Sequence, residues 1–209
     1  MKVIAFDPSK TTGWAWRDCA RDHSAIRCGV FQMPDKADHY YTADQIGLKV
    51  KTFIKELMDN KEAGKPDFAV LEEQSLAKIG NTSADAMIYP WLATSAIVAT
   101  LANFGIPYGT LPAATWRVAF YGKGFKPPLD SKGKKDWKGA AIAACEQMNI
   151  TLPPQKTLAH NAAEACALAI CCQVKAMKVH AGRYQPAWVA LQMARNIKPA
   201  GADLFGSAA

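Results

Sequence analysis

A continuous apolar run, FAVL (68–71), is followed at once by two glutamates, and it constrains the fold more than any other segment. A strand with one wet face alternates apolar and polar residues, whereas a strand covered on both faces does not. We therefore predict a central strand over 68–73, in a sheet covered by helices on both sides. Residues 2–7 (KVIAFD) show the same pattern and predict a second buried strand, which ends at an aspartate.

The segments around these two strands predict an α/β fold. Residues 13–18 and 25–32 are expected to complete an antiparallel meander with the first strand. Residues 42–60 have apolar positions at helical spacing, and Thr42 with Gln45 would form a capping box at the helix start. The remaining elements expected along the chain are a helix over 84–104, a strand over 107–111, and helices over 137–148 and 160–178. This order predicts a mixed five-stranded sheet, with a three-strand antiparallel meander plus parallel strands, flanked by helices.

The size and composition of the chain suit one soluble domain. We expect that domain over residues 1–178 and a C-terminal tail of uncertain structure over 179–209. The formal net charge of +7 favours polyanions and makes nucleic acid the leading partner class, although many soluble proteins are mildly basic. The six cysteines form no CxxC pair, so we expect free, mostly buried thiols. With no signal peptide pattern and no membrane-spanning run, a cytoplasmic protein is expected.

Acidic residues stand at three places that one fold can bring together. Asp7 ends the first apolar strand, Glu72 and Glu73 end the second, and Glu164 sits on an alanine-rich helix. Converging carboxylates repel one another unless a cation lies between them, and oxygen-only sites suit Mg²⁺ or Mn²⁺. The pattern therefore predicts metal-assisted phosphodiester chemistry. For Asp7, which precedes Pro8, a turn-capping role is the competing interpretation.

Three motifs, in order, resemble those of the RuvC-type Holliday junction resolvases of the ribonuclease H-like and retroviral-integrase superfamily. They are FDPSKTTGWA (6–15), LEEQ (71–74) and HNAAEACALAI (160–170). The resemblance covers roughly residues 1–175 and extends to the bacteriophage and prophage branch of the family. It implies a ribonuclease H-like fold and a bacterial or phage-encoded homodimer that binds four-way DNA junctions. It also implies symmetric cutting of two strands at a site with two divalent metal ions.

The resemblance assigns metal ligation to Asp7, Glu73 and Glu164. Successive side chains of a strand point to opposite faces, so only one of Glu72 and Glu73 can share the face of Asp7. In the family motif the catalytic glutamate immediately precedes a glutamine, and Gln74 therefore selects Glu73. Glu72 remains the rival, which would otherwise pair with a basic group or cap a helix.

At one position the chain departs from the family pattern. The family has an Asp or His three residues before the last acid, and this chain has Asn161, with His160 one residue earlier. Both are neighbours of Glu164 on a helix. Asn161 can supply a carbonyl oxygen to a metal, and His160 can act as ligand or proton carrier. Three alternatives stay open: a weaker native second-metal site, replacement of a native Asp, and a His160 that only packs at the helix start.

The resemblance also suggests which residues contact DNA. The loop after the second acid would enter the junction, with Leu76 as an apolar wedge and Lys78 on the backbone, although Leu76 can equally be a buried anchor. A basic patch is expected over 122–138, where any of the last four lysines would hold the scissile phosphate. The lysines of this patch are Lys123, Lys126, Lys132, Lys134, Lys135 and Lys138. The helix over 84–104 would form the dimer interface, with Ile88, Trp91 and Leu92 as candidates.

Other functions compatible with the same residues remain. A nuclease of the superfamily with a different substrate, such as a flap, another branched DNA or an RNA–DNA hybrid, would carry the same acids. A catalytically inactive junction-binding member is the second alternative, and Asn161 is the observation in its favour. A nucleotide-binding fold of the actin or sugar-kinase type shares the opening strand and Asp, but this chain is too short for its two lobes.

Overall fold

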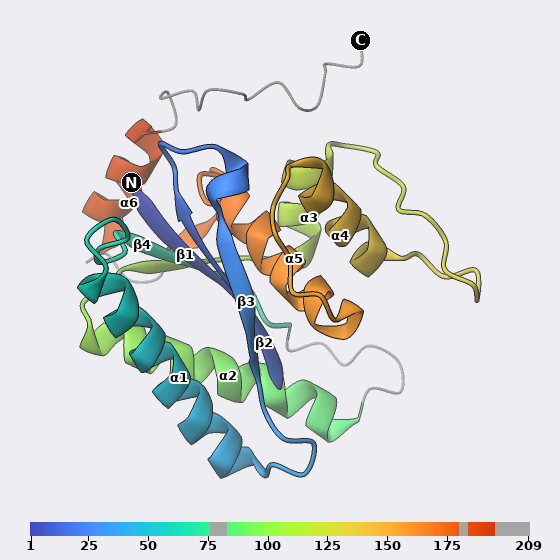
Figure 1. The fold of residues 1–209 in the computed structure, drawn as a ribbon, viewed down its shortest axis with the longest axis horizontal. Helices are drawn as coiled ribbons and strands as arrows, with labels where there is room; N and C mark the ends of the chain where they lie inside the picture. Colours follow the sequence, from blue (N-terminus) through green and yellow to red (C-terminus); the bar gives the residue numbers. More distant parts are fainter. Residues whose placement is uncertain (76–82, 180–183, 195–209) are drawn as a thin grey trace.

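The structure is a computed structural model that describes residues 1–75, 83–179 and 184–194, and it places one sheet between two layers of helices (Figure 1). The strands are β1 (Lys2–Asp7), β2 (Thr11–Asp18), β3 (Arg27–Gln32), β4 (Phe68–Glu72), β5 (Tyr108–Leu111) and β6 (Lys178–Val179). The helices are a short 3₁₀ turn η1 (His23–Ala25), α1 (His39–Asp59), α2 (Ala84–Asn103), α3 (Ala113–Tyr121), α4 (Trp137–Gln147), α5 (Lys156–Ile170) and α6 (Gln185–Met193).

The strands lie in the order β3-β2-β1-β4-β5-β6. β1, β2 and β3 form an antiparallel meander, while β4 runs parallel to β1 and β5 parallel to β4. These pairings confirm the predicted mixed sheet flanked by helices. The predicted number of five strands is wrong, because β6 adds an antiparallel edge through Gly109 and Thr110 of β5. β6 has only two residues, too few to show a period, and the sequence pattern had placed Lys178 at the end of a helix.

The two central strands are buried on both faces, as the FAVL run predicts. Alternate residues belong to two separate hydrophobic cores, one under α1 and α2 and the other under α3, α4 and α5 (Figure 1). The first core contains Ile4, Phe6, Ala69 and Leu71. The second contains Val3, Ala5, Phe68 and Val70. The alternation fixes the face toward which each strand-end acid must point.

Helix α1 begins three residues before the predicted start. Asp38 is its N-cap, and the Asp38 carboxylate accepts a hydrogen bond from the Tyr41 backbone N–H at 2.8 Å. Thr42, the predicted cap, is instead buried inside the helix. An N-cap aspartate satisfies a backbone donor that has no partner in the helix, so it stabilises this start as well as threonine would.

Helix α2 is apolar over most of its length and has Pro90 inside it. Its buried side covers the sheet, while Ile88 and Trp91 are 40% and 38% exposed. Within the part of the chain that the structure describes, no helix is both long and apolar enough to cross a membrane.

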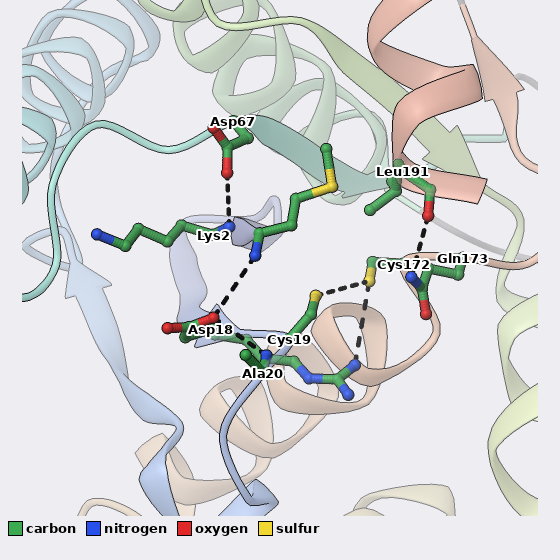
Figure 2. Close-up of polar contacts among 10 residues, drawn as sticks. Lys2, Asp18, Cys19, Ala20, Asp67, Cys172, Gln173 and Leu191 are labelled. Atoms are coloured by element: carbon green, nitrogen blue, oxygen red, sulfur yellow. Dashed lines mark hydrogen bonds and ion pairs between the residues drawn. The ribbon is translucent and has the colours of Figure 1, made fainter. Parts of the chain in front are cut away.

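Polar contacts stabilise the end of the sheet opposite to Asp7 and Glu72 (Figure 2). The backbone N–H of Lys2 donates to Asp67 Oδ2 at 2.7 Å. The terminal ammonium of Met1 lies 3.6 Å from Asp18 Oδ1. These contacts hold the start of β1 against the segment before β4 and against the end of β2.

Part of the segment expected as a tail packs onto this end of the sheet. The Gln173 side chain donates to the Leu191 carbonyl oxygen at 3.0 Å, as Figure 2 shows, and the Gln192 side chain donates back to the Gln173 carbonyl at 3.0 Å. Trp188 lies 6.1 Å from Phe68 between ring centroids. Helix α6 therefore closes the core beneath β4.

All six cysteines are free thiols, as expected, and five of them are buried. Two thiols, those of Cys19 and Cys172, lie 3.9 Å apart where β2 ends beside the end of α5 (Figure 2). The hydrogen bond from Cys172 is the main cause that lowers the pKa of Cys19 to about 7.

Candidate active site at the ends of β1 and β4

Asp7 and Glu72 end two neighbouring parallel strands and point to the same face of the sheet. The strand register pairs Phe6 with Leu71, so Asp7 stands beside Glu72 at the next position. Residues paired in this way share a face, and the alternation assigns both acids to the face covered by α5. The sheet thereby brings two carboxylates together without any loop rearrangement.

Glu164 reaches the same space from α5. Its side chain is buried, in the middle of an alanine-rich stretch that lets α5 lie close to β1 and β2. Gly13, which pairs directly with Asp7, makes the closest approach possible. A Cβ added at Gly13 would overlap the carbonyl oxygen of Asn161 and lie 2.5 Å from the Asn161 carbonyl carbon. Gly13 thus sets the depth of α5, and α5 presents Glu164 to Asp7.

Burial raises the pKa of all three carboxylates, and neighbouring carboxylates add to the effect at Asp7 and at Glu164. Burial, then the charges of Glu164 and Glu72, raise the pKa of Asp7 well above its usual range. Burial and the charge of Glu72 likewise raise the pKa of Glu164. The nearby cations of Lys138 and Arg117 act in the opposite direction on both groups. The site is therefore a partly buried cluster of carboxylates, whose negative charge Lys138 and Arg117 only partly balance.

Two neighbours in α3, which sequence reasoning missed, bind the carboxylates. Trp116 Nε1 donates to Glu72 Oε2 at 2.7 Å, and the Arg117 guanidinium lies 3.5 Å from Glu164 Oε1. The same guanidinium lies over the rings of Trp116 and Trp137, at 5.2 Å and 4.8 Å from their centroids. No local motif marks these residues, because their partners lie more than forty positions away along the chain.

His160 contacts Lys138. The Lys138 ammonium lies 3.1 Å from His160 Nε2, and His160 Nδ1 lies 3.4 Å from the Lys156 carbonyl oxygen. Burial and the Lys138 charge lower the pKa of His160. A neutral imidazole that donates from Nδ1 and accepts at Nε2 satisfies both contacts. Asn161 is half-buried and seated on Gly13, so α5 places it at the level of Asp7.

Glu73 lies on the opposite face of the sheet from Asp7, contrary to the predicted placement. Its carboxylate pairs with the Lys178 ammonium at 2.5 Å and accepts from the Thr110 hydroxyl at 3.4 Å. It lines a pocket of about 570 Å³ next to α2. The LEEQ motif had favoured Glu73, because Gln74 follows it directly. The register of β4 against β1 decides which glutamate faces α5, and it places Glu72 there.

The residues expected to contact DNA are distributed more widely. Among the predicted lysines that the structure describes, Lys138, at the start of α4, is the one whose charge acts on both Asp7 and Glu164. The remaining predicted lysines with described positions are exposed on the segment between α3 and α4, namely Lys123, Lys126, Lys132, Lys134 and Lys135. Leu76 and Lys78 lie outside the described residues.

Over the described ranges, no three acidic, histidine or cysteine side chains form a ready-made metal cluster in this conformation. The contacts above give a physical reason, since Glu72 is turned to Trp116 and Glu164 to Arg117. The donor set itself consists of carboxylate oxygens, with the Asn161 amide nearby, which is the ligand chemistry of Mg²⁺ and Mn²⁺.

Comparison with solved structures shows what the fold resembles. RuvC of Thermus thermophilus superposes with a TM-score of 0.56 at 14% identity, over 86% of this chain and 99% of that one. The chain has the RuvC fold. T. thermophilus RuvC in complex with a Holliday junction substrate superposes over the same shares of both chains, with a TM-score of 0.57 at 12% identity. No protein-family model and no curated protein sequence matches the chain. The RuvC likeness therefore rests on structure, and it confirms the fold that the three motifs implied.

Proposed function

We propose that this protein is a divalent-metal-dependent endonuclease that resolves four-way DNA junctions. The observation that carries the proposal is the placement of Asp7, Glu72 and Glu164 together in one partly buried space, on a RuvC fold. Three carboxylates held close together repel one another when no cation is bound, and a bound cation removes that penalty. The neighbour in complex with a Holliday junction substrate supports branched DNA as the substrate class.

The donor set fits a hard cation once two side chains turn. Glu72 would release Trp116 and Glu164 would release Arg117, so that both carboxylates face Asp7. Asn161 would add a neutral carbonyl oxygen, which predicts that a second ion is held more weakly than by an Asp. Bound Mg²⁺ or Mn²⁺, in one site or two, supplies an activated water and charge neutralisation at the scissile phosphate.

The remaining residues would hold the phosphate and the ligands in place. Released from Glu164, the Arg117 guanidinium would stay over the rings of Trp116 and Trp137 and present N–H donors to a phosphate oxygen. Lys138 is held by neutral His160 beside the acids and offers a second cation. Preorganised donors of this kind stabilise negative charge that develops during phosphodiester cleavage.

Paired nicks require two active sites, so we also propose a homodimer. The exposed Ile88 and Trp91 of α2, together with Leu92, would form part of the interface. These residues lie on the same side of the sheet as Glu73 and its pocket, away from α5. Such a dimer would leave both acidic sites open to DNA.

The decisive test is the cleavage of labelled DNA substrates with Mg²⁺, with Mn²⁺ and with EDTA. We expect symmetric nicks in a synthetic four-way junction, dependent on metal, and at least roughly tenfold slower cutting of linear duplex. Equal cutting of a flap or an RNA–DNA hybrid would replace the junction by that substrate. Tight binding without cutting would favour the inactive alternative, and restored cutting by Asn161→Asp would then trace the defect to that residue.

A further inference from the structure

A small hairpin over residues 128–136 projects from the body of the protein between α3 and α4, on the right of Figure 1. Two backbone hydrogen bonds of 2.7 Å close it, from Asp130 N to the Lys134 oxygen and from Asp136 N to the Pro128 oxygen. Gly133 makes the turn with φ of 72°, a conformation that glycine adopts without strain. The hairpin is thus a defined structure rather than an extended linker.

The two aspartates of this hairpin are engaged with its own backbone. Asp130 Oδ1 accepts from the backbone N–H groups of Lys132 and Lys134, both at 2.8 Å. Asp136 Oδ1 accepts from Gly139 N at 2.8 Å and caps α4. The acids therefore brace the turn and anchor its base to the helix that carries Lys138.

Leu129 and Lys135 project side by side from one face of the hairpin. They form an antiparallel bridge, and the hydrogen bonds that flank it make them a non-hydrogen-bonded pair, in which side chains are closest. Leu129 is 66% exposed. A braced hairpin thus presents an exposed apolar side chain next to the side chain of a lysine.

The hairpin and its approach segment carry more positive charge than their surroundings balance. Five lysines and two aspartates occupy residues 122–136. Among residues 1–75, 83–179 and 184–194, none of these five ammonium groups has an ion pair. Unpaired lysines around an exposed apolar side chain match the chemistry of a DNA backbone that flanks a groove.

We infer that hairpin 128–136 grips a duplex arm of the substrate from the minor groove. Leu129 wedges against a base step, while Lys132, Lys134 and Lys135 contact the phosphates on either side. A single leucine side chain fits a groove about 6 Å wide, and apolar wedges flanked by cations bind DNA in this way. The inference rests on the proposed function in requiring a DNA substrate, but it does not require the junction.

The charge contribution is tested by the salt dependence of DNA binding. The variant K132Q/K134Q/K135Q removes three charges from the hairpin, and K49Q/K51Q/K55Q removes three exposed charges from α1 as the matched control. With EDTA present to prevent cleavage, we expect the slope of log K against log salt to fall by about 2–3 for the hairpin variant only. Equal slopes for the two variants would overturn the inference.

The wedge is tested by base unstacking. A duplex arm labelled with 2-aminopurine should brighten when the wild-type protein binds, because an unstacked fluorophore is less quenched. Leu129→Ser should abolish most of that rise and weaken binding about tenfold, whereas Leu48→Ser, at a 50% exposed position of α1, should change neither. A Leu129→Ser protein that matches wild type in both readouts would contradict the wedge.

Comparing linear duplex with the four-way junction separates this inference from the proposed function. If the hairpin substitutions weaken binding to linear duplex and to the junction alike, and the wild-type protein does not prefer the junction, the role of the hairpin in DNA binding is supported and junction selectivity is contradicted. If the Leu129→Ser protein cuts the junction selectively and keeps wild-type affinity and fluorescence, the proposed endonuclease function is supported and the inferred role of the hairpin is contradicted. A wild-type protein that binds no DNA would overturn both.

Discussion

Glu72→Gln should abolish junction cleavage, whereas Glu73→Gln should retain most of the wild-type rate. The first substitution removes a charge from the face shared with Asp7 and Glu164, and the second removes the partner of Lys178 on the opposite face. Loss of a carboxylate ligand withdraws several kcal/mol of transition-state stabilisation, so we expect a rate loss of roughly a thousandfold or more. Glu73→Gln should cost less than about threefold, since its ion pair is partly exposed.

Single-turnover cleavage of an end-labelled four-way junction in Mg²⁺ measures both rates. Glutamine keeps an oxygen that can accept from Trp116, so Glu72→Gln should fold and bind the junction as wild type does. Binding measured in EDTA is the matched control. The reverse result, an inactive Glu73→Gln and an active Glu72→Gln, would contradict the assignment of Glu72 to the active site and favour Glu73, the glutamate that the LEEQ motif selects.

Gly13→Ala should destabilise the protein by about 3 kcal/mol and also slow cleavage. The added methyl group overlaps the Asn161 carbonyl, and the backbone of a packed helix cannot yield without moving α5. A shift of about 1 Å in α5 moves Glu164 away from Asp7 and can cost about a hundredfold in rate. The effect on stability and the effect on rate therefore have one structural cause.

Urea unfolding of Gly13→Ala, with cleavage measured well below the transition, gives the two quantities separately. Gly47→Ala is the matched control, because Gly47 lies in helix α1 and an added Cβ there meets only the Thr100 hydroxyl at 3.8 Å. That control should be neutral or stabilising by up to about 1 kcal/mol, as alanine is the better helix former. Wild-type stability and rate in Gly13→Ala would show that α5 is not seated on this glycine.

Elements with long, unambiguous patterns were predictable. The apolar runs ending at Asp7 and at the paired glutamates predicted two buried strands, and the spacing of apolar residues in α1 predicted that helix. Its first residues were not predictable from the capping pattern alone, since Asp38 and Thr42 both suit a cap. The two residues of β6 carry no periodic signal, so only their pairing with β5 reveals the strand.

The sequence predicted that acids from three segments converge, but not which of the two glutamates lies on the face of Asp7. The rule that one glutamate alone faces Asp7 follows from strand geometry, whereas the choice depends on the register between β1 and β4, a property of the assembled sheet. The contacts of Trp116 and Arg117 could not be predicted from sequence for the same reason, because long-range packing of α3 brings these residues to the acids.

A calorimetric titration of the metal-free protein with Mn²⁺ tests most directly whether Asp7, Glu72 and Glu164 form a metal site. We predict saturable binding by wild type and by Glu73→Gln, and loss of that binding in Asp7→Asn. Asp7→Asn should also raise the melting temperature of the metal-free protein, because it relieves repulsion among buried carboxylates. Undiminished Mn²⁺ binding by Asp7→Asn would contradict the assignment of Asp7, Glu72 and Glu164 as the metal-binding centre.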